Sequence, residues 1–326
     1  FQVRENRKKQ IAEAAVCGEE EAEEAEKRPE PQLKRKRLCS AGGLLLLNLL
    51  LLVRFSGRFQ FTMLDVGQGE ALFLRTAAGT AILVDGGSTS VSKVGTYRIL
   101  PFLKAEGVGR LDYVVATHLD KDHVSGIEEL LLQSARPGNL KIGTLLLSEA
   151  SWKEEKGKEL AALARGSGVR IGTIGEGMIL EDSSARLDCL YPCAGVEYAD
   201  TNAASVTFRV TCGKFSMLLT GDLGEEGEEE ILRMGVETDC DVLKAGHHGS
   251  STSSSEAWLQ AASPVLTLIS CGKDNSYGHP HQETLMRLQA AGSRVLVTAD
   301  CGALTVRSDG ERFQVEGFTE SERYEK

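Results

Sequence analysis

The chain has 326 residues, of which 41% are hydrophobic and 26% are charged, and its net charge is −10. This length and composition fit one globular α/β domain with additional segments. The acidic excess argues against broad, unspecific binding to duplex DNA, which needs a basic face. A net negative charge is still compatible with a basic lining that is confined to one groove.

The N-terminal part divides into a charged segment, 1–37, and an apolar segment, 38–55. Residues 1–40 contain 10 Lys/Arg and 9 Asp/Glu and show almost no apolar periodicity, which is typical of a solvated or weakly helical segment. The run from Leu38 to Val53 carries no charge and approaches the roughly 17–25 residues of a membrane span. We predict a transmembrane segment over 38–55. A buried core helix is the alternative, although such a helix normally keeps a polar stripe.

The charges that flank the apolar run predict its orientation. Four cations at 34–37 precede it, whereas Arg54 and Arg58 follow it. Since positive charge favours the cytoplasmic side, we expect 1–37 in the cytoplasm and the C-terminal domain outside the cytoplasmic membrane. A cleaved signal peptide is disfavoured, because some forty residues precede the run and no small-residue cleavage site follows it.

From residue 58 onward, patterns typical of strands alternate with patterns typical of helices. Strands are expected at 58–64, 71–76, 81–85, 112–118, 141–147, 205–210, 215–220, 240–245, 265–270 and 294–299, with several shorter ones before 205. Helices are expected at 97–106, 125–133, 152–165, 225–234, 254–262 and 282–291. We expect the strand over 294–299 to close a domain that spans 59–316, and residues 317–326 to form a frayed tail.

The domain holds most of the cysteines of the chain, and none of them has zinc-knuckle spacing. They are Cys189, Cys193, Cys212, Cys240, Cys271 and Cys301. Disulfides are permitted in a domain outside the membrane, but their pairing cannot be read from the sequence. Buried free thiols are the alternative.

All six histidines fall within three short motifs, THLDKDH, KAGHHGS and YGHPH. In pairs, these motifs contain His118 and His123, His247 and His248, and His279 and His281. The first motif adds Asp120 and Asp122, and this mixture of imidazoles and carboxylates is what a hydrolytic metal pair uses. The alternative for THLDKDH is an ordinary strand-to-helix loop with N-capping aspartates.

Each candidate polar residue follows a predicted strand. These residues are Asp65 after FTML, Asp85 after AILV, His118 after VVAT, Asp222 after MLLT and His247 after VLKA. Polar groups that follow neighbouring strands converge on one edge of a sheet, where open α/β proteins build their active sites. Gly67 and Gly69 would allow a tight turn and a close backbone approach under this edge.

Six motifs occur in the order LDVGQGE, ILVDGG, THLDKDH, LLTGDL, LKAGHHGS and YGHPH. In this order they resemble the metallo-β-lactamase fold and, more narrowly, the C-terminal hydrolase-like domain of ComEC-type DNA-uptake (competence) proteins. The resemblance covers about residues 59–316 and implies an α/β fold, an αββα sandwich with two metals at the sheet edges. In that family a membrane segment often runs directly into the LDVGQG strand, and the apolar run stands in that place here.

The resemblance also implies the metal ligands. It assigns His118 and Asp120 to a first metal, Asp122, His123 and His247 to a second, Asp222 to both as a bridge, and His248 to the substrate. Asp120 stands where a histidine is usual, and no histidine lies between His123 and His247 to complete the first site. We therefore expect two divalent metals, Mn²⁺ or Zn²⁺, with the first bound weakly and the harder ligand set favouring Mn²⁺.

Several further residues are expected to act around the metals. Asp65 and Asp85 would fix imidazole tautomers through hydrogen bonds, and Lys244 would stabilise charge on a phosphoryl group. Ser250 and His279 are candidate substrate contacts. His281 precedes a helix whose N-terminus favours anions, and it or His248 would assist the leaving oxygen. For Lys244 the alternative is a surface lysine, and for Asp85 and His281 the alternatives are turn and helix-capping roles.

The resemblance implies hydrolysis of a phosphodiester by a metal-activated water. We expect a nuclease at the outer face of the membrane that acts on single-stranded or duplex DNA, degrading one strand while the other enters an uptake channel encoded upstream of Phe1. The first alternative is a membrane-anchored hydrolase of a small phosphodiester or another ester. The second is a catalytically idle domain that binds nucleic acid or protein, and the intact ligand set counts against it.

Overall fold

The computed structural model describes residues 57–136 and 138–318. They belong to one compact unit, Ser56–Lys326. The predicted charged segment, 1–37, and the predicted transmembrane segment, 38–55, lie outside the described residues. Within the described part of the chain, no helix is both long and apolar enough to cross a membrane.

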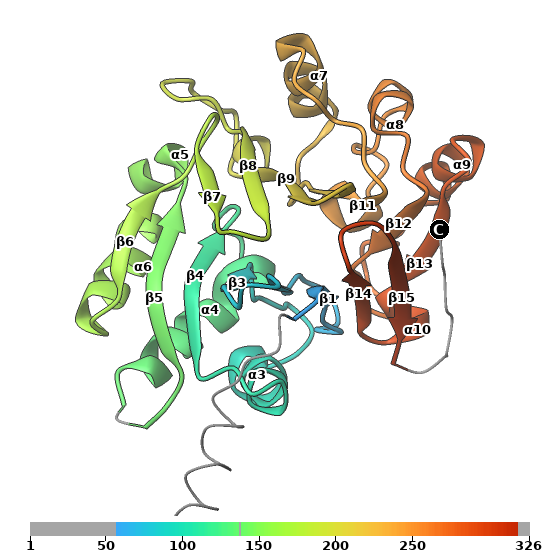
Figure 1. The fold of residues 1–326 in the computed structure, drawn as a ribbon. Coiled ribbons are helices and arrows are strands. Elements are labelled where there is room, and N and C mark those ends of the chain that lie inside the picture. The colour runs from blue at the N-terminus through green and yellow to red at the C-terminus, as the bar shows by residue number, and fades with distance from the viewer. Residues whose placement is uncertain (1–56, 137, 319–326) are drawn as a thin grey trace, which may run out of the picture. The chain divides into compact units, whose positions relative to one another are not determined.

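Two β-sheets form the centre of this unit (Figure 1). The eight-stranded sheet has the order β15-β14-β1-β2-β3-β4-β5-β6, and the seven-stranded sheet has the order β13-β12-β11-β10-β9-β8-β7. The strands of the first sheet are β1 (Phe59–Met63), β2 (Leu72–Arg75), β3 (Ala81–Val84), β4 (Arg110–Ala116), β5 (Lys141–Leu147), β6 (Arg170–Thr173), β14 (Leu304–Ser308) and β15 (Phe313–Gly317). Those of the second are β7 (Ile179–Glu181), β8 (Arg186–Tyr191), β9 (Thr207–Cys212), β10 (Phe215–Leu219), β11 (Val242–Lys244), β12 (Leu266–Ile269) and β13 (Arg294–Val297).

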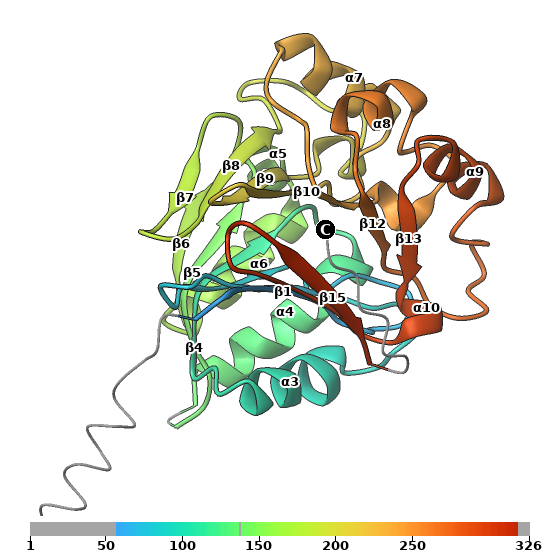
Figure 2. The same cartoon turned by 45° about the vertical axis from the view of Figure 1, so that its right-hand side comes forward.

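Helices cover the outer face of each sheet, so the unit is a four-layer αββα sandwich (Figure 2). The helices are η1 (Gly95–Ile99), α3 (Leu100–Ala105), α4 (Lys121–Ser134), α5 (Glu149–Lys153), α6 (Glu155–Gly166), η2 (Asn202–Ala204), α7 (Glu225–Met234), η3 (Gly246–Gly249), α8 (Glu256–Ala262), α9 (Gln282–Ala290) and α10 (Thr298–Cys301). Strands β3 to β6 are parallel, and so are β10 to β13. Within each parallel set the carboxyl ends therefore meet at one edge, where the loops carry the candidate ligands.

Alternation along the strands builds the apolar layers. Phe59, Phe61 and Met63 of β1 point between the two sheets and are fully buried. The ring of Phe59 lies 5.7 Å from that of Phe215 on β10, which joins the two sheets. On β2, Phe73 points the other way and packs under the helices of the first sheet.

The C-terminal end of the domain differs from the prediction. Strand 294–299 was expected to close the domain, but β14 and β15 follow it and extend the first sheet beyond β1. The alternating residues Leu304 and Val306 are fully buried between the sheets. These alternating residues predict a strand with one buried face, but its partner β1 lies at the other end of the domain sequence.

The single helix predicted over 152–165 is in fact two helices, α5 and α6. Between them Glu154 is extended, with φ −81° and ψ 150°. A Cβ at Gly157 would lie only 1.9 Å from the carbonyl oxygen of Ser151. The extended Glu154 therefore ends α5 and lets the backbone of α6 pack directly on it, an approach that a side chain at position 157 would prevent.

Five cysteines of the domain, whose state the sequence left open, are free thiols. Cys189, Cys212, Cys240 and Cys271 are buried, and Cys193 is half-buried. Burial raises the pKa of the Cys189 and Cys271 thiols to about 12. These thiols stay protonated at neutral pH and fill the core, which agrees with the alternative of buried free thiols.

Candidate metal centre

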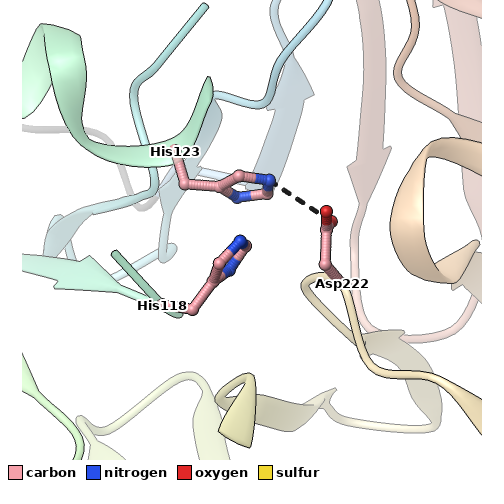
Figure 3. A group of neighbouring side chains, drawn as sticks. All are labelled: His118, His123 and Asp222. Carbon is pink, nitrogen blue, oxygen red and sulfur yellow. Dashed lines mark ion pairs between the residues drawn. The ribbon is translucent and has the colours of Figure 1, made fainter. Parts of the chain in front are cut away.

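The candidate ligands come from the loops that follow β4, β10 and β11. His118 follows the end of β4, and Asp122 and His123 occupy the first turn of α4. Asp222 follows β10, and His248 lies in the short turn after β11. Figure 3 shows His118, His123 and Asp222 pointing toward one another from three separate elements.

In the described part of the chain, four overlapping groups of side chains bring potential ligand atoms within 4.8 Å of one another. Two of them are His118, His123 and Asp222, and Asp122, His123 and His248, and the other two include Glu70. Nε2 of His123 lies 3.3 Å from Oδ1 of Asp222. Nε2 of His248 lies 3.6 Å from Oδ2 of Asp122 and 3.5 Å from Oδ2 of Asp222. The two oxygens of Asp222 thus face different imidazoles, an arrangement that suits a bridging carboxylate.

Asp85 orients two of these imidazoles from its buried place after β3. Its Oδ2 accepts from Nδ1 of His123 at 2.8 Å and from Oγ1 of Thr117 at 2.7 Å. Because the Thr117 hydroxyl donates to Asp85, it is free to accept from Nδ1 of His118 at 3.1 Å. Both rings therefore turn Nε2 toward the site. Asp85 has a φ of 58°, a left-handed conformation that is rare outside glycine and is found where a site constrains the backbone.

His248, rather than His247, has both ring nitrogens engaged at the site. Its buried Nδ1 donates to the carbonyl of Ser270 at 2.9 Å, which leaves Nε2 for the carboxylates. His247 is 31% exposed, and its Nε2 lies 3.7 Å from Oδ2 of Asp222. The family resemblance implies His247 on the metal and His248 at the substrate, whereas the geometry favours His248 as the ligand and His247 as the more open ring.

Burial and charge set the protonation of these groups. Burial raises the pKa of Asp122 and Asp222, but His248 and His123 outweigh it and lower the pKa of Asp122 to about 2 and that of Asp222 well below its usual value. Burial, helped by His123, lowers the pKa of His118 well below its ordinary value. Ionised carboxylates beside a neutral imidazole are the form in which these side chains bind metal.

Orphaned buried atoms show that the residues fit a divalent cation. Nε2 of His118 and Oδ1 of Asp222 are buried without a hydrogen-bond partner. Nε2 of His123 and Nε2 of His248 lie 3.3 Å apart, although the Nδ1 proton of each ring is already committed elsewhere. Burial opposes protonation of His123, but Asp222 and Asp85 raise its pKa well above the usual value, so a metal would displace a proton here. Imidazole and carboxylate donors suit Zn²⁺ and Mn²⁺.

The first metal has fewer candidate ligands than the second, and they lie farther apart. Asp120 is 53% exposed, and its Oδ2 lies 4.0 Å from Nε2 of His118. Asp120 occupies the N-cap position of α4, but its side chain makes no capping hydrogen bond. The alternative of capping aspartates is therefore wrong for Asp120, whose Oδ1 accepts instead from Oγ1 of Thr201 at 3.4 Å.

Lys244 is buried next to the candidate ligand Asp222. Its side chain is fully buried and forms an ion pair with Glu70, which is also fully buried. Its Nζ donates to the carbonyl of Gly221 at 2.6 Å and lies 3.9 Å from Oδ1 of Asp222. The alternative of a surface lysine is wrong, because the side chain of Lys244 is fully buried. Its expected stabilisation of a phosphoryl group stays a prediction, and its ion pair with Glu70 supports a structural role.

Glu70 is the residue that the sequence reasoning missed. It ends the LDVGQGE motif, its backbone amide donates to the carbonyl of Asp122 at 2.9 Å, and burial raises its pKa although Lys244 opposes the shift. Glycines allow this loop to approach α4. A Cβ at Gly69 would lie 2.3 Å from the carbonyl oxygen of Gly87, and one at Gly87 would lie 2.3 Å from the amide of His123. The G-x-G pattern predicts a tight turn, but no local pattern shows that the carboxylate after it is buried.

Two other predicted residues stabilise turns. Oδ1 of Asp65 accepts from the amide of Gly67 at 3.2 Å, a contact within its own turn, and its role in orienting an imidazole stays a prediction. Ser250 is buried, and its Oγ pairs with Oγ1 of Thr252 at 3.0 Å. The hydroxyl of Ser250 is therefore engaged within its own loop, and its contact with a substrate stays a prediction.

His279 and His281 extend the histidine cluster. The ring centroid of His279 lies 5.7 Å from that of His247 and 6.2 Å from that of His248. Burial, with these two rings, lowers the pKa of His279 to about 4, so it is neutral at physiological pH. The ring of His281 lies 4.9 Å from that of His279, and its Nδ1 accepts from the amide of Ser251 at 2.9 Å. Nδ1 of His281 is therefore an acceptor, and Nε2 is the ring nitrogen left to donate.

Comparison with known proteins gives the family context of this site. Residues 64–135 match the sequence profile of the metallo-beta-lactamase superfamily. The chain is 34% identical to ComE operon protein 3 of Bacillus subtilis (strain 168) over 265 residues, which are 77% of this chain and 33% of that protein. It is 32% identical to competence protein ComA of Neisseria gonorrhoeae over 244 residues, 74% of this chain and 31% of that protein. The chain spans about a third of the length of these curated relatives.

Among solved structures, the metallo-beta-lactamase fold protein YhfI from Bacillus subtilis superimposes with a TM-score of 0.50 and 13% identity, covering 73% of this chain and 96% of YhfI. At this identity the likeness shows the fold alone, and it agrees with the two helix-covered sheets. The chain therefore carries a metallo-β-lactamase domain, the fold of a metal-dependent hydrolase, and is homologous to part of the ComEC-type competence proteins.

Proposed function

We propose that the chain is a metal-dependent phosphodiesterase that cleaves DNA. The observation that carries the proposal is the convergence of three imidazoles and two carboxylates in two overlapping ligand groups, one of His118, His123 and Asp222 and one of Asp122, His123 and His248. The family profile and the relatives named as competence proteins support it.

These side chains would hold two divalent cations, with Asp120 as a further ligand of the first. Bound metals supply positive charge for the phosphoryl oxygens and lower the pKa of water toward ~7. Hydrogen bonds within the chain orient the ligands even without a bound metal. Asp85 and the carbonyl of Ser270 accept from Nδ1 of His123 and Nδ1 of His248, which leaves Nε2 of each ring toward the site. The ammonium of Lys244 lies 3.9 Å from Oδ1 of Asp222.

A side chain that donates a hydrogen bond to the leaving oxygen would assist its departure. His248 does not suit this role, because Ser270 engages one ring nitrogen and the carboxylates face the other. His281 suits it better, since its Nδ1 accepts from the amide of Ser251 and Nε2 is left as the donor. We assign His281 to a hydrogen bond with the leaving oxygen or with another phosphate oxygen.

The relatives suggest where the reaction takes place. We propose that the domain acts at the outer face of the cytoplasmic membrane during DNA uptake, degrading one strand while the other passes through a channel. The predicted span over 38–55 and the cations at 34–37 support this placement. Because the chain matches about a third of each relative, the channel would belong to the remaining part of such a protein.

One observation favours a second function, the hydrolysis of a small phosphodiester or another ester. The net charge of −10 repels a polyanion, whereas a small substrate needs no basic face. The two functions can be distinguished by whether DNA or a small ester is the substrate that is hydrolysed fastest.

A substrate panel tests the proposal. The purified chain, supplied with Mn²⁺ or Zn²⁺, is assayed on single-stranded DNA, duplex DNA, a small phosphodiester and a carboxylic ester. We expect DNA cleavage that is lost in Asp222→Ala and after chelation, with Lys214→Met, an exposed substitution, as the matched control. Turnover of the ester alone, or cleavage that persists in Asp222→Ala, would overturn the nuclease assignment.

A further inference from the structure

An exposed tyrosine stands next to the candidate metal centre. Tyr277 lies in the loop between β12 and α9, and its side chain is 55% exposed. Its ring stacks on that of His279, with centroids 5.6 Å apart and an interplanar angle of 23°. Since one ring face rests on His279, the exposed area lies on the other face and along the ring edge.

His279 links this ring to the candidate ligands. Its centroid is 6.2 Å from that of His248, and the two planes are tilted by 31°. Nδ1 of His279 is buried without a hydrogen-bond partner. A single neutral ring therefore separates the exposed face of Tyr277 from a buried imidazole that faces Asp122 and Asp222.

Asn275 fixes the loop that presents the tyrosine. Its side-chain amide donates to the carbonyl of Gly272 at 2.9 Å and to that of His279 at 2.5 Å. Its Oδ1 accepts from the amide of Tyr277 at 3.2 Å and from that of His279 at 3.0 Å. A surface held in this way loses little conformational freedom when a ligand binds to it, which favours binding.

From this geometry we propose that Tyr277 and His279 form a stacking platform for an unpaired nucleobase beside the phosphodiester that is cleaved. The proposal rests on the proposed function and narrows the substrate to single-stranded DNA. Bases inside a duplex are covered on both faces by their neighbours, so only an unpaired base can lie against Tyr277. Stacking is tolerant of sequence, and it supplies affinity that a net charge of −10 does not.

The test measures binding and cleavage separately in the full chain. Binding is followed by fluorescence anisotropy with Ca²⁺ in place of Mn²⁺, using a labelled oligothymidylate and an abasic oligomer of equal length that keeps the phosphodiesters and lacks the bases. The variants are Tyr277→Ala, Tyr277→Phe and the matched control Tyr97→Ala, which removes another tyrosine, 65% exposed, from η1.

We expect the wild type to bind oligothymidylate more tightly than the abasic oligomer. Tyr277→Ala should raise the Kd for oligothymidylate about 5- to 150-fold, which corresponds to ~1–3 kcal/mol for one stacked base, and should bring the Kd ratio of the two oligomers close to one. Tyr277→Phe and Tyr97→Ala should keep the preference for bases. An unchanged Kd for Tyr277→Ala would overturn the platform.

Cleavage with Mn²⁺ separates this inference from the proposed function. If the wild type cleaves oligothymidylate and Tyr277→Ala keeps the full preference for bases, the nuclease assignment stands and the platform falls. If Tyr277→Ala loses the preference while the wild type cleaves no DNA, the platform stands as a binding site and the nuclease assignment falls.

Discussion

Replacement of Lys244 by methionine should destabilise the domain strongly. The substitution keeps the length and most of the volume of the side chain but removes the ammonium that pairs with Glu70. Both side chains are fully buried, so water cannot replace the lost partner. The variant also loses the hydrogen bond from Nζ to the carbonyl of Gly221, which is 2.6 Å long.

The magnitude follows from the uncompensated charge. Removing one partner of a buried ion pair typically costs about 3–5 kcal/mol, because the other charge stays buried. Replacing both partners is often far less costly, since no charge is then left without compensation. We therefore expect Lys244→Met to lower the free energy of unfolding by about 3–5 kcal/mol, and Glu70→Gln/Lys244→Met to recover a large part of this loss.

Urea unfolding of the metal-free chain measures these values, because chelation removes the contribution of metal binding. The matched control is Lys214→Met, which breaks the exposed pair with Glu311, whose side chains are 77% and 66% exposed. That control should unfold close to the wild type. If Lys244→Met is no less stable than Lys214→Met, or if the double variant is less stable than Lys244→Met, the buried pair does not have the role assigned to it.

Four further outcomes follow from the site and the sequence. Calorimetric titration should show two metal sites of unequal affinity, and Asp222→Ala should abolish both; two equally tight sites would mean that a ligand has been missed. Asp85→Asn should weaken metal binding about 10–100-fold, because both imidazoles lose their orienting partner, and an unchanged affinity would contradict the shared role of Asp85. A reporter that is active only in the cytoplasm should stay silent when it is fused after Lys326, and strong activity would reverse the proposed topology. Burial raises the pKa of Asp182, but hydrogen bonds from Thr76 and Thr80 outweigh it and lower this pKa to about 2. The ionised carboxylate therefore stabilises the folded state, and protonation at low pH removes this contribution. In thermal melts, the stability difference between the wild type and Asp182→Asn should shrink as the pH falls from about 5 to about 2.

The sequence was sufficient to place the ligand motifs at strand ends. His118, Asp222 and the histidine pair each follow an apolar run, and in the structure these runs are β4, β10 and β11. Within one sheet, parallel strands bring their carboxyl ends to one edge, which explains why the ends of β10 and β11 meet. The strand β4 belongs to the other sheet, so its approach to them depends on how the two sheets pack. The strand β14 was not predicted. It pairs with β1, which lies at the other end of the domain sequence, and no local pattern indicates such a long-range pairing.

Side-chain direction was the part that the sequence could not supply. His247 and His248 are adjacent and chemically identical, and only the backbone of their turn, with φ 47° and 55°, decides which ring faces the carboxylates. Lys244 shows the same limit. A lysine in an apolar strand beside a ligand motif can face the substrate, the solvent or the core, and its burial depends on Glu70, 174 positions earlier in the chain.

The buried pair also explains how the site can be assembled before a metal binds. Four carboxylates, those of Glu70, Asp85, Asp122 and Asp222, lie together at this edge and would repel one another if all were charged. Lys244 neutralises one of them and lies 3.9 Å from a second, while His123 and His248 face the rest. The remaining negative charge attracts divalent cations without preventing the fold. We therefore expect the metal-free domain to fold with its ligands already facing one another, so that chelation lowers its stability but does not unfold it.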